Sequence, residues 1–266
     1  MRELVKNLIP PILLQLIKKA LLKSQPTFTI YPSWQEAQKA SFGYDEDNFI
    51  RKLRNSAKLV FEKKEVYERD TVIFTKTEYS WPLLASLLFV SSKCKSLKLI
   101  DFGGALGTSY HQNKFFLSKL NINYKWRIIE QPRLVEIGKK EFTDKFVSFY
   151  NTIEEASKDQ IDAVFFGGSI CYLDNPYSYL DAAIATKAPY IIIDRTPITK
   201  DMNDTFAVQH VDPSIYKASY PIRNFSYANI VNAFAENYTL IEDWVCDLQA
   251  DPENIAMGFI FERNSI

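Results

Sequence analysis

The sequence has few of the residues that build disulfides and metal sites. Its 266 residues include three cysteines and two histidines. Cys94, Cys171 and Cys246 lie far apart and form no CxxC pair, so neither a disulfide framework nor a zinc site is expected. His111 and His210 are too few for a histidine-rich site, so we expect no metal. This cysteine usage is typical of a reducing compartment, and we expect a cytoplasmic protein.

The chain also lacks net charge, because 32 Lys and Arg balance 32 Asp and Glu. A partner such as nucleic acid is held by a basic surface field, so we expect no nucleic-acid binding. Hydrophobic residues make up 47% of the sequence, which is enough for the core of one large domain with an accessory segment.

The N-terminal stretch has no uninterrupted apolar run of the roughly 20 residues that a spanning helix needs. Lys6, the pair Pro10-Pro11 and the pair Lys18-Lys19 break it, and no small-residue cleavage site of a signal peptide follows. Residues 1–24 instead predict an amphipathic basic helix. Two interpretations follow: the helix packs on its own domain or a partner subunit, or it lies peripherally on an anionic inner membrane face.

Residues 1–78 predict an N-terminal helical extension. Residues 25–35 contain two prolines and predict an irregular linker, and residues 45–69 are charged and helical in pattern. Ser80 is then expected to cap a helix that carries Pro82 in its first turn.

Residues 79–266 predict the main domain, in which short apolar runs alternate with amphipathic segments from residue 97 onward. The expected strands are 97–102, 124–130, 145–150, 161–168 and 189–195, and the expected helices are 108–120, 132–142, 152–158, 176–187 and 226–236. This alternation predicts an α/β fold with a mostly parallel sheet and helices on both faces. The strands 238–246 and 256–263 have only a short link, so they should pair antiparallel.

Three of only eight glycines crowd into residues 103–107, directly after a strand that is expected to end in Asp101. Ligands of open parallel sheets bind beyond the carboxyl ends of the strands. Gly103, Gly104 and Gly107 let main chain approach a ligand without a Cβ, and a helix that starts at Thr108 presents unpaired N–H groups there. The segment predicts a cofactor loop; the alternative is a tight strand–helix turn without a ligand.

The other strand ends are also polar or small. Glu130 follows the second strand, where a carboxylate can accept hydrogen bonds from a ribose diol, or it is a solvated acid at a helix start. Asn151 follows the third strand and either bonds an adenine edge or caps a helix. Gly167, Gly168 and Ser169 follow the fourth strand, as bare backbone for the cofactor or as a plain turn.

The stretch "LIDFGGALG" resembles motif I, D-x-G-x-G-x-G, of class I S-adenosylmethionine-dependent methyltransferases, with Ala105 in place of the middle glycine. More narrowly, "DFGGALGTSY", "IEQPRLVEIGKK", "IIIDRTPIT" and "HVDPSIYKASYP" resemble a family of bacterial methyltransferases often associated with surface-polysaccharide gene clusters, over roughly residues 30–266.

This resemblance implies a Rossmann-like, seven-stranded sheet with an antiparallel last strand and S-adenosylmethionine as cofactor. It implies that Asp101 and the glycines at 103, 104 and 107 face the methionine part of the cofactor, and that Glu130 faces the ribose. The G-x-G-x-x-G fingerprint of NAD binding fits poorly, because it would place Ala105 where the pyrophosphate needs a second glycine.

The resemblance implies a methyltransferase, and its gene-cluster association points to a sugar hydroxyl or glycan precursor as acceptor. A general base would assist such a hydroxyl. The candidates are Asp194 with Arg195, and His210 with Asp212, each of which is alternatively structural; Tyr172 is expected at the acceptor pocket. Two other functions stay open: a non-catalytic, cofactor-binding partner in a glycan assembly, and, disfavoured by the glycine spacing, an NAD-dependent oxidoreductase.

Overall fold

A computed structural model describes residues 27–43, 46–62, 67–69, 71–211, 218–246 and 254–264. The helix expected over residues 1–24 lies outside these residues. No helix within the described part of the chain is both long and apolar enough to cross a membrane.

The central sheet has five parallel strands in the order β6-β5-β4-β7-β8. They are β4 (Ser96–Phe102), β5 (Asn123–Ile129), β6 (Val147–Tyr150), β7 (Ala163–Gly167) and β8 (Tyr190–Thr199). β12 (Ile255–Arg263) runs antiparallel to β8 on one side and to β11 (Tyr238–Val245) on the other. The predicted Rossmann-like, mostly parallel sheet with an antiparallel last strand is therefore confirmed, as is the antiparallel pairing of the last two strands. Among the described residues, these seven strands are part of a sheet of ten, because three further strands extend it.

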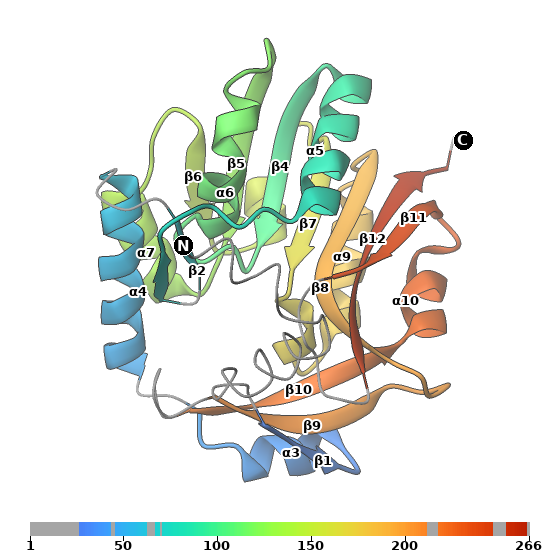
Figure 1. Ribbon diagram of the computed structural model, residues 1–266. Coiled ribbons are helices and arrows are strands. Elements are labelled where there is room, and N and C mark those ends of the chain that lie inside the picture. The colour runs from blue at the N-terminus through green and yellow to red at the C-terminus, as the bar shows by residue number, and fades with distance from the viewer. Residues whose placement is uncertain are drawn as a thin grey trace, which may run out of the picture.

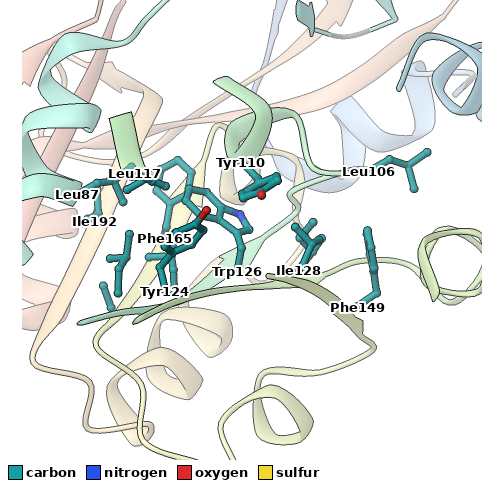
Figure 2. Packing of buried hydrophobic residues seen from close by; sticks show 14 of the residues in the cluster. Leu87, Leu106, Tyr110, Leu117, Tyr124, Trp126, Ile128, Phe149, Phe165 and Ile192 are labelled. Carbon is teal, nitrogen blue, oxygen red and sulfur yellow. The ribbon is translucent and has the colours of Figure 1, made fainter. Parts of the chain in front are cut away.

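Helices cover both faces of this sheet (Figure 1). One face packs against α4 (Glu46–Phe61), α5 (Trp81–Cys94), α6 (Thr108–Leu117) and α7 (Pro132–Glu141), and the other against α8 (Ile153–Ala156), α9 (Pro176–Ala185) and α10 (Tyr227–Phe234). Neighbouring residues of a strand enter opposite cores, as Leu99 and Ile100 do. Trp126 lies at the centre of the first core (Figure 2).

The predicted start of α5 is confirmed. The Ser80 hydroxyl accepts a hydrogen bond from the Leu83 N–H, and Pro82 stands in the first turn. The helix expected over 45–69 is too long: α4 ends at Phe61, and residues 67–69 form β2 (Tyr67–Arg69), which pairs with β3 (Val72–Phe74). The helical extension thus also contains strands.

Three antiparallel strands, which we call the cap sheet, continue the central sheet: β1 (Thr27–Tyr31), β9 (Thr205–His210) and β10 (Ser219–Ser226). The end of β10 pairs in parallel with the end of β8, where Phe225 is opposite Ile198. The cap sheet crosses below the carboxyl ends of the parallel strands, together with α3 (Trp34–Ala40) (Figure 1).

The expectation of an irregular linker over 25–35 is wrong, because β1 and the start of α3 lie there. β9 and β10 lie between the strand expected over 189–195 and the helix expected over 226–236, where no strand was expected. The residues of β1, TFTIY, are β-branched or aromatic and begin as an alternation of polar and apolar residues, as strands do. The two prolines that indicated a linker, Pro26 and Pro32, flank this segment in the sequence and do not interrupt it.

Candidate functional site

A pocket of about 610 Å³ lies at the carboxyl ends of the parallel strands. From β4 the chain continues to β5 and β6 on one side, and β7 and β8 follow on the other, so the pocket lies where the strand order reverses. Its lining residues are Arg69, Phe102, Gly103, Gly104, Ala105, Thr108, Ser109, Ile129, Glu130, Gln131, Pro132, Asn151, Gly167, Gly168, Ser169, Tyr172, Leu173, Tyr179 and Arg195. The expected position for a ligand is thus hollow.

The loop after β4 needs its glycines. Gly103 has φ +72°, and a Cβ there would lie 2.5 Å from the Ser169 Cβ. A Cβ on Gly104 would lie 2.6 Å from the carboxyl carbon of Asp101. Both glycines line the pocket, whereas Gly107, with φ +102°, only starts α6 and does not line it. Gly103 and Gly104 are therefore required because a Cβ at either position would clash with a neighbouring side chain. As a result, main chain without side chains forms this part of the pocket wall.

Asp101 does not line the pocket, although the resemblance implies that it faces the cofactor. It is 1% exposed and lies behind Gly104, where its Oδ2 accepts a hydrogen bond from the Trp126 indole N–H at 2.7 Å. Burial raises the pKa of Asp101 to about 7, while the Trp126 hydrogen bond and the charge of Arg195 act in the lowering direction. The carboxyl thus supports the loop from within the core.

We expect the free energy of unfolding of Asp101→Asn to rise relative to that of wild type as the pH rises. The folded-state pKa of about 7 exceeds the ordinary 3.8, so the folded protein holds this proton more tightly than the unfolded chain. Wild-type stability therefore falls as pH rises between these values, by up to about 1.4 kcal/mol per pH unit from this group, and asparagine removes that loss. Urea unfolding of both proteins at about pH 5 and about pH 8 measures it. An unchanged difference between the two proteins would contradict the assignment.

Glu130 lies at the end of β5 and joins the glycine loop to that strand. Its Oε1 accepts a hydrogen bond from the Ala105 N–H at 3.1 Å, and its Oε2 accepts one from the Gln131 N–H at 2.9 Å. Burial raises the pKa of Glu130, and these two N–H groups act in the lowering direction. Each carboxylate oxygen keeps acceptor capacity toward the pocket, which is what the hydroxyls of a ribose need.

The remaining expected cofactor residues come together at the same pocket. Asn151 lines it after β6, and its own N–H donates to the Glu155 carboxylate at 3.1 Å. Gly167 and Ser169 line it after β7, and the Ser169 hydroxyl donates to the Phe102 carbonyl at 2.7 Å. The turn after β7 is thereby tied to the end of β4.

The structure does not bring His210 to this pocket. His210 lies in β9 with a ring nitrogen 3.2 Å from the Thr29 hydroxyl. Its neighbour Gln209 accepts a hydrogen bond from the Tyr172 hydroxyl at 2.7 Å, and adjacent residues of a strand point to opposite faces. Gln209 therefore faces the pocket wall and His210 faces away from it, so the side chain expected as a base does not line this pocket. Its expected partner Asp212 lies outside the described residues.

The second candidate pair is divided between core and pocket. Asp194 is fully buried, does not line the pocket, and accepts hydrogen bonds from the Trp244 indole N–H at 3.0 Å and the Cys246 thiol at 3.2 Å. Arg195 does line the pocket, with its Nε 3.8 Å from Asp194 Oδ2. This geometry leaves Asp194 out of reach as a general base and presents Arg195 to a ligand.

Arg69 is a pocket residue that the sequence analysis did not identify. It comes from the short strand β2, where the buried neighbour Glu68 accepts a hydrogen bond from the Thr108 hydroxyl at the start of α6. The segment "YER" is embedded in a charged stretch, so nothing in its pattern signals a pocket. Among the described residues no group of His, Cys, Asp and Glu is arranged to hold a metal ion.

No protein-family model matches the sequence, and no curated protein matches it. Several solved structures have a similar arrangement, and their names include methyltransferases. The N-terminal domain of EvdMO1, solved in the presence of SAH and D-fucose, is 15% identical over 80% of this chain and 97% of its own, with a TM-score of 0.49. The Burkholderia thailandensis 1,6-didemethyltoxoflavin-N1-methyltransferase is 12% identical over 92% and 98%, with a TM-score of 0.48. CalS10, an amino pentose methyltransferase from Micromonospora echinaspora, is 13% identical over 70% and 92%, with a TM-score of 0.44. At these identities no substrate or residue role carries over to this chain.

Proposed function

We propose that this chain is an S-adenosylmethionine-dependent methyltransferase and that the pocket beside β4 and β5 binds the cofactor. The observation that carries the proposal is Glu130, a pocket carboxylate whose two oxygens are held by the N–H groups of the adjoining loop and turn. It stands next to a wall of bare main chain at Gly103 and Gly104. A ribose diol on the carboxylate and an amino-acid part along the loop match this donor and acceptor set.

The lining residues fit the three parts of that cofactor. Glu130 would accept from the ribose hydroxyls, and the loop with the first turn of α6, at Thr108 and Ser109, would hold the amino-acid part. Ile129 and Asn151 would receive the adenine. The bound cofactor supplies a methyl group on a sulfonium, which makes that methyl reactive.

An NAD-binding role fits less well. The G-x-G-x-x-G phase departs from this sequence at two positions, Ala105 and Thr108, whereas D-x-G-x-G-x-G departs only at Ala105. In the NAD fingerprint the second glycine lets a pyrophosphate approach main chain. Ala105 lines the pocket with φ +50°, so its methyl group stands where a bare backbone is required.

We infer that the protein contributes alignment and exclusion of water more than proton transfer. Methyl transfer is an in-line displacement, and fixed geometry alone can supply several kcal/mol of rate enhancement, on the order of 7–11 in the best-aligned cases. Among the described lining residues Glu130 is the one carboxylate, and backbone N–H groups already hold it. Tyr172 and Tyr179 also line the pocket, and their side chains can orient an acceptor there.

We propose a sugar hydroxyl or glycan precursor as the acceptor, supported by the resemblance of four sequence segments and by the tyrosine rings of the pocket, which suit a sugar face. A non-catalytic, cofactor-binding role is the second candidate. The absence of an unengaged carboxylate among the described lining residues favours it. Bound cofactor without turnover on nucleotide sugars and lipid-linked glycans would decide for that role.

Calorimetric titration with S-adenosylhomocysteine and with NAD tests the cofactor. We expect the first to bind and the second not to bind. Glu130→Ala should weaken S-adenosylhomocysteine by roughly tenfold to a hundredfold, since it removes charge-assisted hydrogen bonds to the ribose. Glu136→Ala, on the exposed face of α7, is the matched control and should change nothing. The proposal would be refuted if the protein bound NAD and not S-adenosylhomocysteine. It would also be refuted if Glu130→Ala bound S-adenosylhomocysteine as tightly as wild type does.

A further inference from the structure

The end of β8 contains an irregularity that turns one side chain toward the pocket. In the pairing of β8 with β12, Ile193 is opposite Phe259 and Thr196 is opposite Met257. Two residues of β8, Asp194 and Arg195, therefore lie opposite one residue of β12, Gly258, and this mismatch is a β-bulge. Arg195 has φ +54°, in the left-handed region that residues other than glycine occupy at an energetic cost. Bulges of this kind redirect side chains next to functional sites.

The bulge is fixed from behind by β11 and the residue that follows it. Trp244 and the Cys246 thiol donate to the Asp194 carboxylate, and the Arg195 N–H donates to the Cys246 sulfur at 3.3 Å. Burial raises the pKa of Cys246 to about 12, so the group remains a thiol that can donate and accept at once. The Trp244 ring reaches this position because Gly258 has no Cβ, which would lie 2.1 Å from the ring. Four residues thus hold the backbone of Arg195 in its unusual conformation.

The Arg195 guanidinium has donors left for a ligand. Its Nη2 donates to the Gly167 carbonyl at 3.0 Å, and its buried Nε has no hydrogen-bond partner and lies 3.8 Å from Asp194 Oδ2. The side chain is 23% exposed, and it lines the pocket. A guanidinium carries five N–H groups in a planar fork, which matches a carboxylate or a phosphate.

The charged residues around the pocket favour an anion on the side formed by the end of β8. The charged residues among its described lining are Arg69, Glu130 and Arg195. Glu130 stands at the end of β5, separated from β8 by β4 and β7. Asp194, which lies behind Arg195, is fully buried and does not line the pocket. A sulfonium cofactor would add positive charge, so an anionic partner would complement the β8 side.

We propose that Arg195 binds an anionic group, a carboxylate or a phosphate, carried by the methyl acceptor. This inference rests on the proposed methyltransferase function and narrows its acceptor to a negatively charged sugar. An alternative source of the same chemistry is the carboxylate of the cofactor itself, and the experiment separates the two.

The test uses the full chain saturated with S-adenosylhomocysteine and three probes: glucuronate, glucose 1-phosphate and neutral glucose. Binding is measured by ligand-observed NMR titration. We expect at least one anionic sugar to bind about tenfold or more tightly than glucose, as a charge-assisted hydrogen bond implies. Arg195→Asn should abolish this preference, and asparagine tolerates positive φ. Arg195→Lys keeps the charge beside Asp194 and should retain part of the preference. Arg51→Asn, on the exposed face of α4, should retain all of it.

Three results would overturn the proposal. The first is equal binding of glucose and both anions to wild type, and the second is an unchanged preference in a folded Arg195→Asn protein. The third is that Arg195→Asn loses affinity for S-adenosylhomocysteine but not for 5′-methylthioadenosine, which lacks the amino-acid part. This result would show that Arg195 binds the carboxylate of the cofactor and not the acceptor. If wild type does not bind S-adenosylhomocysteine, the proposed function fails, while the same sugar titrations on cofactor-free protein still report on Arg195.

Discussion

Replacing Asp204 by alanine should lower the free energy of unfolding by about 3–5 kcal/mol, the cost of removing one partner of a buried ion pair. The Asp204 side chain is 8% exposed and accepts four hydrogen bonds. The donors are the Ser226 N–H and the Asn229 amide at 2.9 Å each on Oδ1, and the Tyr177 hydroxyl at 2.9 Å and the Arg223 guanidinium at 3.2 Å on Oδ2. One carboxylate therefore connects α9, β10 and α10.

The loss would be large because Arg223 would keep its charge in a mostly buried position. Its guanidinium lies between the rings of Trp34 and Phe206, with its carbon 5.7 Å and 4.9 Å from their centres. Urea unfolding measures the change, and Asp201→Ala, at an exposed position three residues earlier, is the control that should shift stability little. A loss no larger than that of the control would show that the cap sheet does not depend on this carboxylate.

Gly258→Ala should destabilise the protein by about 3 kcal/mol, through overpacking and a lost buried hydrogen bond. The added Cβ would lie 2.1–2.4 Å from three atoms of the Trp244 ring. The ring must move, and the Asp194 carboxylate then loses the indole N–H that it accepts at 3.0 Å. The bulge that presents Arg195 would be disturbed with it.

Thermal unfolding of Gly258→Ala beside Gly43→Ala separates crowding from backbone strain. Gly43 has φ +66° and nothing within 4 Å of its added Cβ, so its substitution costs only the strain, about 1–2 kcal/mol. We expect Gly258→Ala to lose more stability than Gly43→Ala does, and to bind the anionic sugar probes more weakly than wild type. Equal losses would mean that the Trp244 ring accommodates the methyl group freely.

The central sheet was predictable because its strands are buried on both faces. Such strands appear as short apolar runs, as in residues 97–102 and 161–168, and the order of strands and helices then limits the topology. The cap sheet was not predictable from such runs. β1 pairs with β9 from the far end of the chain, and neither segment by itself indicates which distant strand it pairs with.

The candidate site was predictable where it consists of backbone. Gly103, Gly104 and Glu130 lie at the pocket because strand ends of a parallel sheet meet at one edge. The side-chain candidates depended on directions that the sequence did not reveal. His210 pointed away once residues 205–210 formed a strand, and Arg195 pointed inward because a bulge, which needs Gly258 and Trp244, altered its direction.

The pairing of β1 with β9 has a consequence for the order of events during synthesis. The Thr29 hydroxyl and the His210 ring that contact each other are 181 residues apart along the chain. At translation rates of about 5–20 residues per second, β1 leaves the ribosome roughly ten to forty seconds before its partner exists. Its sequence, "TFTIY", has no charged residue to discourage other chains from adding to it in that interval. The hydrogen-bonding edge that β9 occupies in the folded protein is therefore open on every nascent copy until synthesis has reached residues 205–210.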